Sequence, residues 1–385
     1  MRVLAHYALD ESARAQLERV SAEIMACFAA GGYRRLALPL LQPADLYLDM
    51  AGEDIRERMF VFEDPAGAEI CLRADLTIPA CRSVIDDAAA ALPARLSCLG
   101  PIFRFGSGDD LAPTELLQAG IECLGAADPV AADAEVFGLA REALDRARVG
   151  PMKIEIGDVA LFPALLADLA IDAIWIRRLA YAFRHPSLLR PTLDDLDARV
   201  RPPAKTFEVD LVALDTASAE RFVRDKLGVS GDELVFGRTV SEIAAHLVDK
   251  AKAARAPLPG RAELDVIEAF LTIEDRADDG LARLKGLTTG TAFAEALAHF
   301  EEALARARAH ARPGDALVLK STLGRNFIYY TGFVFELTQS GISDPIASGG
   351  RYDGLMSDLG SPVPVPAVGC AIWPERVLAA GARDG

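Results

Sequence analysis

The chain has 385 residues, of which 51% are hydrophobic and 25% charged, so it is globular and long enough to bury a large core. Its formal net charge of −16 argues against a broad nucleic-acid-binding surface, because phosphate recognition draws on clustered lysine and arginine. No apolar run approaches the roughly 20 residues that a membrane-spanning helix needs, and no basic-then-apolar leader is present, so we expect a cytoplasmic protein without membrane partners.

Metal-binding spacings do not occur in the sequence. The six cysteines are scattered through apolar surroundings without a Cys-Xaa-Xaa-Cys pair, and the five histidines are not spaced as ligands. Such cysteines are typical of buried free thiols in a reducing cytoplasm. We therefore expect neither a metal nor a cofactor.

The first segments alternate helix and strand. Residues 10–30 repeat apolar side chains at helical spacing behind a possible cap at Asp10. Residues 33–39 are predicted to form a strand that ends at a proline. Residues 59–63 and 69–73 alternate around a glycine-containing turn, which predicts a β-hairpin.

Two polar residues, Asp75 and Thr77, follow this hairpin. Either could cap a helix that runs from Ile78 to Val84. A carboxylate beside a hydroxyl also provides the acceptors that an ammonium group requires, so the pair is equally suited to bind an amino group. Both interpretations can hold together.

Two further strands are predicted at residues 98–104 and 115–125, and Arg104 ends the first of them. Gln118 and Glu122 are four residues apart on the second strand, so their side chains point to the same face. Polar side chains on an inward face need partners, and a bound polar ligand could supply them. The alternative is that they bond to each other or to backbone groups.

The middle of the chain is mostly helical. A helix at 131–148 and a strand at 152–156 precede it, and residues 163 to about 315 are rich in alanine, leucine and glutamate. The clearest helix covers residues 291–310, where one apolar stripe faces a charged surface. We therefore expect a discontinuous core of residues 1–165 and 316–385 and a mostly helical inserted region of residues 166–315.

The C-terminal segments contain the most distinctive motifs. Arg325 precedes an aromatic and β-branched run, residues 327–335, that predicts a buried strand. A Gly-Gly-Arg-Tyr-Asp-Gly turn follows at 349–354, where it could shape the chain or line a pocket. An apolar strand at 367–372 then leads directly to Glu375, Arg376 and a short helix.

This ordered set of segments resembles the catalytic core of a histidyl-tRNA synthetase over about residues 10–160 and 320–376. Tyr329 and Tyr330, after Arg325, match the tyrosine pair of the histidine-specific signature. The resemblance implies an α+β, class II aminoacyl-tRNA synthetase-like core, in which an antiparallel sheet is flanked by helices. It also implies a histidine pocket formed by Asp75, Thr77, Arg104, Gln118, Glu122, Arg325, Tyr329 and Tyr330.

The residues that correspond to the ATP site of the synthetase family depart from its pattern. Gly106 stands where the family has the glutamate that meets adenine, and Trp373 stands where a small glycine lets adenine approach. Residues 105–115 contain no lysine or arginine but include Asp109 and Asp110, whereas adenylate formation needs positive charge against the triphosphate. Arg376 matches the family arginine that stacks on ATP, although a buried structural ion pair is an equally fair interpretation.

These departures, and the absence of a C-terminal anticodon-binding domain, make the chain similar to the regulatory subunit of ATP phosphoribosyltransferase, a paralogue of the synthetase. The resemblance implies a dimer without catalytic activity that joins the short-form catalytic subunit in a hetero-oligomer. It would enable or stimulate the first step of histidine biosynthesis and contribute to feedback inhibition by histidine. Two alternatives stay open: a truncated class II synthetase that activates an amino acid, and a free-standing histidine sensor. No nucleic acid is expected as a partner.

Overall fold

The computed structural model describes most of the chain, namely residues 10–48, 58–87, 91–106, 113–200, 211–228, 239–287, 290–325, 327–342 and 344–381. The chain divides into two compact units, one of residues 1–164 and 270–385 and the other of residues 165–269. Within the described ranges, no helix combines the length and apolar character needed to cross a membrane.

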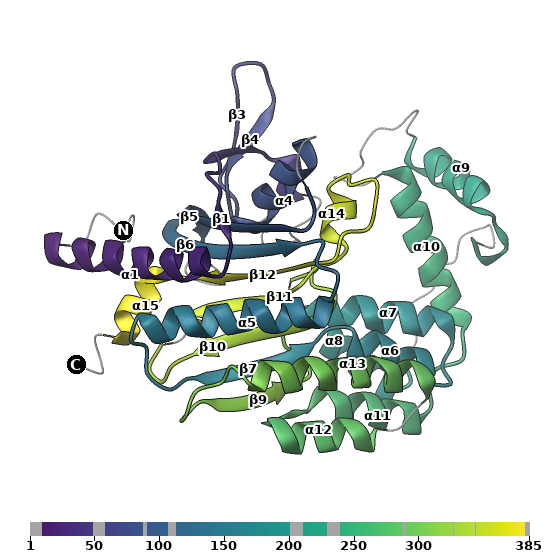
Figure 1. The fold of residues 1–385 in the computed structure, drawn as a ribbon. Helices are drawn as coiled ribbons and strands as arrows, with labels where there is room; N and C mark the ends of the chain where they lie inside the picture. The colour runs from purple at the N-terminus through teal and green to yellow at the C-terminus, as the bar shows by residue number, and fades with distance from the viewer. Residues whose placement is uncertain are drawn as a thin grey trace. The chain divides into compact units, whose positions relative to one another are not determined.

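The first unit is built on a nine-stranded sheet with the order β1-β5-β6-β12-β11-β10-β7-β9-β8 (Figure 1). Its strands are β1 (Arg34–Arg35), β5 (Ala94–Phe105), β6 (Pro113–Leu124), β7 (Lys153–Asp158), β8 (Glu274–Arg276), β9 (Ala316–Lys320), β10 (Phe333–Thr338), β11 (Ala347–Arg351) and β12 (Ala367–Ile372). Neighbouring strands are antiparallel except for the pairs β1–β5 and β7–β9. The predicted α+β class is confirmed, with a mixed and predominantly antiparallel sheet.

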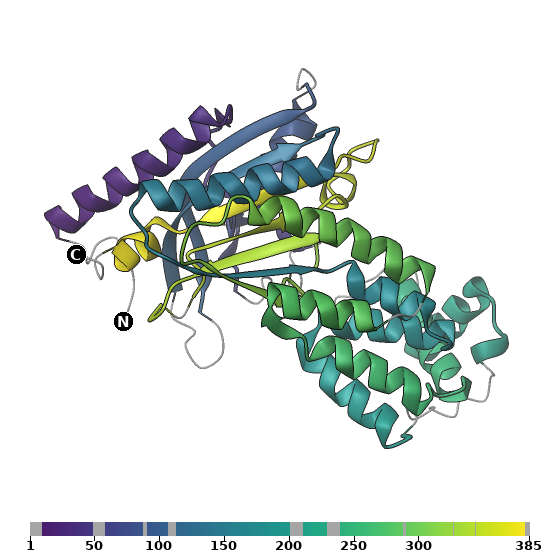
Figure 2. The same cartoon turned by 60° about the horizontal axis from the view of Figure 1, so that its bottom comes forward.

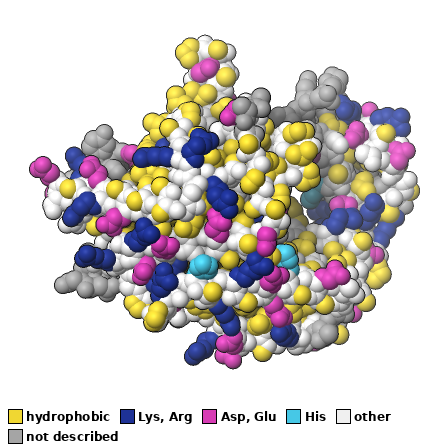
Figure 3. All heavy atoms as spheres, in the orientation of Figure 1, with side chains coloured by type: hydrophobic (Ala, Val, Ile, Leu, Met, Phe, Trp, Pro, Cys, Tyr) yellow, Lys and Arg dark blue, Asp and Glu magenta, His cyan; other side chains and the backbone are white. Residues whose placement is uncertain are grey.

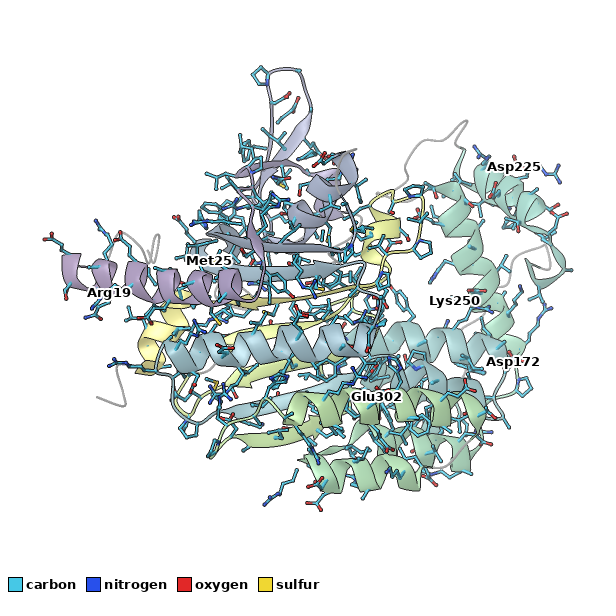
Figure 4. The ribbon with its side chains drawn as sticks, viewed as in Figure 1. Arg19, Met25, Asp172, Asp225, Lys250 and Glu302 are labelled. Atoms are coloured by element: carbon cyan, nitrogen blue, oxygen red, sulfur yellow. The ribbon has the colours of Figure 1, made fainter. Side chains whose placement is uncertain are left out.

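One face of this sheet is covered by helices α1, α5 and α13, which lie side by side in both views (Figures 1 and 2). The helices of this unit are α1 (Glu11–Ala30), α2 (Asp45–Leu48), α4 (Thr77–Asp86), α5 (Pro129–Arg146), α12 (Ala277–Gly286), α13 (Thr291–Arg308), α14 (Leu355–Asp358) and α15 (Pro374–Gly381), with α6 (Leu161–Asp168) at its boundary. Aspartate side chains cap the first turns of α1 and α5. Asp10 accepts a hydrogen bond from Ala13 N, and Asp128 accepts one from Ala131 N. On α1, Met25 is buried and Arg19 is exposed (Figure 4).

A second, three-stranded sheet has the order β2 (Leu41–Pro43), β4 (Glu69–Leu72) and β3 (Val61–Glu63). The predicted hairpin is confirmed, because β3 and β4 pair in antiparallel register around a turn with Gly67 at φ +86°. Hydrophobic side chains gather over this projecting hairpin (Figure 3), where Val61 and Phe62 are exposed. Behind it, α4 and α14 share a buried apolar cluster with Val334 of β10.

The two faces of the central sheet follow from strand alternation. Phe335 of β10 packs edge-on against Phe137 of α5, with ring centroids 5.2 Å apart. Its neighbour Val334 must point to the opposite face, where it joins the cluster with α4. Side chains on this second face therefore lie toward the loops and helices that form the pocket described below.

The strand predicted over residues 327–335 is wrong in its first half. Tyr330 N donates to Phe327 O at 3.2 Å and Thr331 N donates to Arg351 O at 2.8 Å, so residues 327–332 turn before β10 begins at Phe333. The difference matters because adjacent strand residues point to opposite faces. In the turn, the neighbouring Tyr329 and Tyr330 can line the same pocket.

Helices are the only regular elements among the described residues of the second unit. Its elements are α7 (Ala173–Arg184), α8 (Pro186–Asp197), η1 (Leu211–Ala213), α9 (Thr216–Leu227), α10 (Val240–Arg255) and α11 (Arg261–Leu271), which continues past its boundary. Asp172 accepts from Ile174 N at the start of α7 (Figure 4), and Thr239 and Glu242 form a capping box at the start of α10. This unit is shorter than the inserted region expected from the sequence, because β8 pairs with β9 and α12 packs on both strands.

Candidate functional site

A small pocket in the sheet unit opens to solvent and has a cavity volume of about 40 Å³. Six of the eight residues expected around histidine line it: Asp75, Thr77, Arg104, Gln118, Tyr329 and Tyr330. They come from the start of α4, the end of β5, the middle of β6 and the turn before β10. Tertiary structure thus brings together residues that are more than 250 positions apart in the chain.

Asp75 is both a helix cap and a wall of the pocket. It is 4% exposed, and its Oδ1 accepts a hydrogen bond from Ile78 N at 3.1 Å. Its Oδ2 is buried and makes no hydrogen bond to any described residue. Burial raises the pKa of this carboxyl, and the nearby Arg104 guanidinium opposes that rise. A buried acceptor without a donor is costly, so a cationic ligand here would be favoured.

Arg104 places a positive charge in the same pocket. Its Nε donates to Ala74 O at 2.7 Å, which holds the guanidinium beside Asp75. Phe105, the next residue, stacks on Phe60 with ring centroids 4.0 Å apart and anchors the end of β5. A carboxylate and a guanidinium on one small pocket are the two groups that complement the ammonium and carboxylate of a free amino acid.

Glu122 lies behind the pocket wall and is 3% exposed. The hydroxyls of Tyr352 and Thr77 hydrogen-bond to its carboxyl. Burial raises the pKa of Glu122 to about 8, so the group is mostly protonated at neutral pH. Gly369 faces it across the β6–β12 register, and a Cβ there would overlap Glu122 Oε2. The close approach of the carboxyl to β12 therefore depends on glycine.

Gln118 links β6 to the start of α4. Its Oε1 accepts a hydrogen bond from Leu76 N at 3.0 Å, and its side chain is buried on the pocket wall. Gln118 therefore bonds to a backbone group, which is one of the alternatives that the sequence left open. Because Leu76 lies between Asp75 and Thr77, the same bond also fixes the two polar residues at the helix start.

Aromatic rings form the remaining wall of the pocket. Tyr329 and Tyr330 have ring centroids 5.0 Å apart, and Tyr329 lies 6.0 Å from Tyr352 in an edge-on arrangement. Burial raises the pKa of Tyr329 well above its ordinary value, so its phenol stays protonated and can donate a hydrogen bond. The pocket therefore combines an apolar ring cluster with fixed polar groups, which suits a small ring-bearing ligand.

Arg325 is not among the residues that line this pocket. It is half-buried in the turn that follows β9, and burial lowers the pKa of its guanidinium. In this arrangement Arg104 is the arginine that borders the pocket, so the role that the resemblance gives to Arg325 stays a prediction. Asp109 and Asp110 of the predicted acidic loop lie outside the described residues.

Comparisons with known proteins agree with this geometry. A family model described as histidyl-tRNA synthetase matches residues 7–226 and 237–377. A protein of Chelativorans sp., described as an ATP phosphoribosyltransferase regulatory subunit, is 35% identical over 362 residues, which cover 93% of this chain and 96% of the relative. The chain belongs to the ATP phosphoribosyltransferase regulatory subunit family.

Other relatives support the same assignment. A regulatory subunit of Mesorhizobium japonicum is 34% identical over 366 residues, covering 94% of this chain and 96% of its own. Among solved structures, an ATP phosphoribosyltransferase regulatory subunit/histidyl-tRNA synthetase from Bacillus halodurans aligns with a TM-score of 0.66 at 21% identity, over 95% of this chain and 79% of that chain. A histidine–tRNA ligase subunit from Alicyclobacillus acidocaldarius aligns with a TM-score of 0.61 at 22% identity, over 96% and 94%. At these identities the structures establish the shared fold.

In this regulatory-subunit chain, other residues of the chain bind Arg376, the match to the family arginine that stacks on ATP. The Arg376 guanidinium lies 4.5 Å from the ring centroid of Trp373, and its Nη1 donates to Pro345 O at 2.6 Å. Its Nη2 also lies 3.7 Å from Asp344, so an ion pair is present. Trp373 itself lines the pocket. The indole and the guanidinium thus cover each other at this end of the pocket.

The Gly-Gly-Arg-Tyr-Asp segment of this family member has two separate roles. Arg351 is buried away from the pocket, where it pairs with Asp133 at 2.6 Å and donates to Pro129 O. Tyr352 lines the pocket and bonds to Glu122. The turn predicted from Gly349 is wrong in its first half, because Gly349 to Arg351 belong to strand β11; the pocket-lining alternative holds for Tyr352.

Sequence reasoning missed several of the pocket residues, namely Phe327, Ser348, Gly369, Cys370 and Ala371. Most lie on β11 and β12, whose short, small side chains carry no chemical signal of their own. The available signal was strand pairing, because Gly369 stands opposite Glu122. Among the described residues, no group of three or more His, Cys, Asp or Glu side chains could hold a metal ion.

Proposed function

We propose that this chain is a non-catalytic regulatory subunit of ATP phosphoribosyltransferase that acts in the cytoplasm in the first step of histidine biosynthesis. It forms a dimer and joins the short-form catalytic subunit in a hetero-oligomer. It stimulates phosphoribosyl transfer to ATP by that partner and contributes to feedback inhibition by histidine. The observation that carries the proposal is the 35% identity to a protein described as such a subunit, which extends over 93% of this chain.

The pocket supports histidine as the effector. The ammonium group of histidine would meet Asp75, whose Oδ2 is buried without a hydrogen bond, and the hydroxyl of Thr77. Its carboxylate would meet Arg104, and its imidazole would lie against Tyr329 and Tyr330. Glu122 and Gln118 would hold this wall in place, while Arg325 would contribute from the neighbouring turn.

The proposed lack of catalysis is supported at the other end of the pocket. Adenylate formation requires fixed positive charge and space for a nucleotide. Trp373 occupies the wall there, and Arg376 is already stacked on it and bonded to Pro345 O. The end of the pocket with Asp75 and Arg104 therefore offers more binding groups to a ligand than the end with Trp373 and Arg376.

Histidine can inhibit a distant active site only if it binds two states of the complex with different affinity. We therefore expect histidine to favour one arrangement of the regulatory and catalytic subunits over another. Removing its binding groups should leave complex formation in place and abolish the response to histidine.

The test is reconstitution of the full chain with the short-form catalytic subunit of the same organism. We expect the two proteins to co-elute on size exclusion, phosphoribosyl transfer to increase, and histidine to inhibit the complex. The Asp75→Asn chain should lose inhibition by histidine, whereas Asp86→Asn, an exposed carboxylate at the end of the same helix, should keep it.

Other results would favour the alternatives. Histidine-dependent exchange between ATP and pyrophosphate by the chain alone would show a synthetase-like enzyme. Histidine binding without complex formation or stimulation would favour a free-standing sensor. Absence of complex, stimulation and histidine binding would contradict the proposal altogether.

A further inference from the structure

The helical unit contains a pocket of its own with about 1420 Å³ of atom-free space open to solvent. Three helices of that unit, α7, α8 and α10, supply its walls (Figure 1). The lining residues are Arg177, Arg178, Tyr181, Ala182, Leu188, Thr192, Glu242, His246 and Asp249. Nothing in the family assignment or in the proposed histidine site gives this pocket a role.

The acidic groups of this pocket are already engaged. Asp249 accepts a hydrogen bond from Arg177 Nη2 at 3.1 Å, which neutralises both side chains. Glu242 accepts hydrogen bonds from the backbone and side chain of Thr239 in the capping box of α10. Both carboxylates therefore already have hydrogen-bond partners, and Asp249 is shared between Arg177 and the nearby Arg178.

Arg178 differs from Arg177 because one of its side-chain nitrogens has no hydrogen bond. Its Nε is buried and makes no hydrogen bond, and no carboxylate among the described residues lies within ion-pair distance of its guanidinium. The guanidinium carbon lies 5.6 Å from the ring centroid of Trp175, one helical turn earlier. Burial lowers the pKa of Arg178, and the nearby Asp249 carboxylate opposes that fall.

A second donor shows the same deficiency. Trp175 is 2% exposed, and its Nε1 is buried without an acceptor among the described residues. A buried donor without an acceptor is destabilising, so such an atom marks a missing acceptor. The unsatisfied atoms of Trp175 and Arg178 are both donors, so the group that would complete them is an acceptor.

The apolar part of the pocket lies beside this charge. Tyr181 is 58% exposed and stacks on His185 with ring centroids 4.0 Å apart, which fixes the plane of its ring. Leu188, on α8, is also exposed and lines the same pocket. An exposed, oriented aromatic ring next to the Arg178 guanidinium offers stacking and charge recognition together.

We propose that this pocket binds a small organic anion that carries a flat ring. The anionic head, a carboxylate or a phosphate, accepts hydrogen bonds from Arg178, with His246 at its edge. The ring lies against Tyr181 and Leu188. The site is separate from the pocket assigned to histidine, so the proposal holds whether or not histidine binds to the sheet unit.

The chain contains only two tryptophans, Trp175 and Trp373, which makes a direct measurement possible. In the full chain carrying Trp373→Phe, Trp175 is the single indole and lies under the Arg178 guanidinium. We would titrate this protein with phenyl phosphate, benzoate and inorganic phosphate and follow indole fluorescence. Phenyl phosphate or benzoate should change the fluorescence saturably, and inorganic phosphate should bind at least about tenfold more weakly because it lacks the ring.

Substitutions then assign the binding to this pocket. Arg178→Met should weaken binding about tenfold or more, because a charge-assisted hydrogen bond is lost. The matched control is Arg190→Met on α8, an exposed arginine that pairs with Asp194 and does not line the pocket. His246→Ala removes an exposed side chain at the edge and should weaken binding about threefold even if Arg178→Met does not fold.

Three results would overturn the proposal. One is the lack of any saturable change with the two ring-bearing anions. Another is equal affinity for inorganic phosphate and phenyl phosphate, which would show that the ring contributes nothing to binding. The third is an unchanged affinity of the folded Arg178→Met protein for phenyl phosphate. If that variant does not fold, an unchanged affinity of the His246→Ala protein overturns the proposal instead.

Discussion

Two buried charge clusters of the sheet unit differ in how completely their polar atoms are paired. In the first, Arg351 pairs with Asp133 at 2.6 Å, with Asp353 at 2.8 Å and with Pro129 O at 2.6 Å. In the second, the pocket of Asp75 and Arg104, one buried carboxylate oxygen has no hydrogen bond. The saturated cluster joins β11 to α5, whereas the incomplete one faces a cavity.

The difference separates groups that hold the fold from groups that bind. A saturated buried pair exposes nothing to a ligand, and losing one partner leaves the other charge buried alone. An incomplete cluster is destabilising by itself and gains from a ligand that completes it. Substitutions in the first cluster should therefore affect stability most, and substitutions in the second should affect binding most.

The largest expected effect is on stability, from Arg351→Met. This change leaves Asp133 buried without its cation, which should lower the free energy of unfolding by roughly 3–5 kcal/mol in urea denaturation. Arg82→Met, at an exposed pair with Asp86, should cost less than about 1 kcal/mol.

The double variant Arg351→Met with Asp133→Asn sharpens this prediction. Removing both charges should recover part of the loss, because no uncompensated carboxylate remains. A double variant no more stable than Arg351→Met alone would contradict the assignment of the loss to the isolated charge.

The next effect is on binding, from Asp75→Asn. Asparagine can still cap α4 through its side-chain oxygen, so stability should change little. The ammonium group of histidine would lose its charged acceptor, and calorimetry should show roughly 10- to 100-fold weaker binding.

Asp86→Asn is the control for this substitution, since it removes an exposed carboxylate of the same helix. It should leave the affinity for histidine unchanged. Equal affinities of the wild-type and Asp75→Asn proteins would place histidine elsewhere in the molecule.

Much of the fold could be predicted from the sequence, because its signals are local. The hairpin of β3 and β4, helix α13 and strand β12 follow from residue alternation, helical spacing and turn glycines. The run from Phe327 was misread because an aromatic, β-branched segment looks the same in a strand and in a buried turn. The hydrogen bonds of the turn distinguish the two, and one of them, from Thr331 N to Arg351 O, joins distant residues.

The pocket was predictable to the extent that polar residues stood out in apolar segments. Asp75, Arg104 and Gln118 did so, and all three line it. Ser348 and Cys370 did not, because small side chains on β11 and β12 acquire a role only through strand pairing. The position of Arg325 outside the lining depends on the path of a turn, which local sequence does not determine.

A smaller effect concerns pH and comes from Glu122→Gln. Burial raises the pKa of Glu122 to about 8, so the folded chain keeps a proton that the unfolded chain releases above its ordinary pKa of 4.5. Stability must then fall as pH rises from about 4.5 to about 8, at up to roughly 1.4 kcal/mol per pH unit from this group.

Glutamine cannot ionise, so the Glu122→Gln protein should show a flatter fall in this window. The measurement is the difference in the free energy of unfolding between the two proteins at pH 6 and pH 7. Asp133, whose pKa is raised to about 6, contributes equally to both proteins and cancels. Parallel pH profiles would contradict a buried, protonated Glu122.

The smallest effect is expected from Tyr352→Phe, which removes the hydroxyl that bonds to Glu122. The ring and its packing stay, so the loss should be about 1 kcal/mol. This hydrogen bond favours the ionised carboxylate, and its removal should raise the pKa of Glu122 further. The pH at which stability stops falling should therefore move upward.

Tyr33→Phe provides the matched comparison, because the Tyr33 hydroxyl donates to Glu135 at 2.9 Å, away from the pocket. Glu135 is also paired with Arg95, which lowers its pKa, so that carboxylate stays ionised when the hydroxyl is removed. Tyr33→Phe should shift the free energy of unfolding by a similar amount at every pH above about 6. If both tyrosine variants gave the same pH profile, Glu122 would be ionised like Glu135, which would contradict a buried, protonated Glu122.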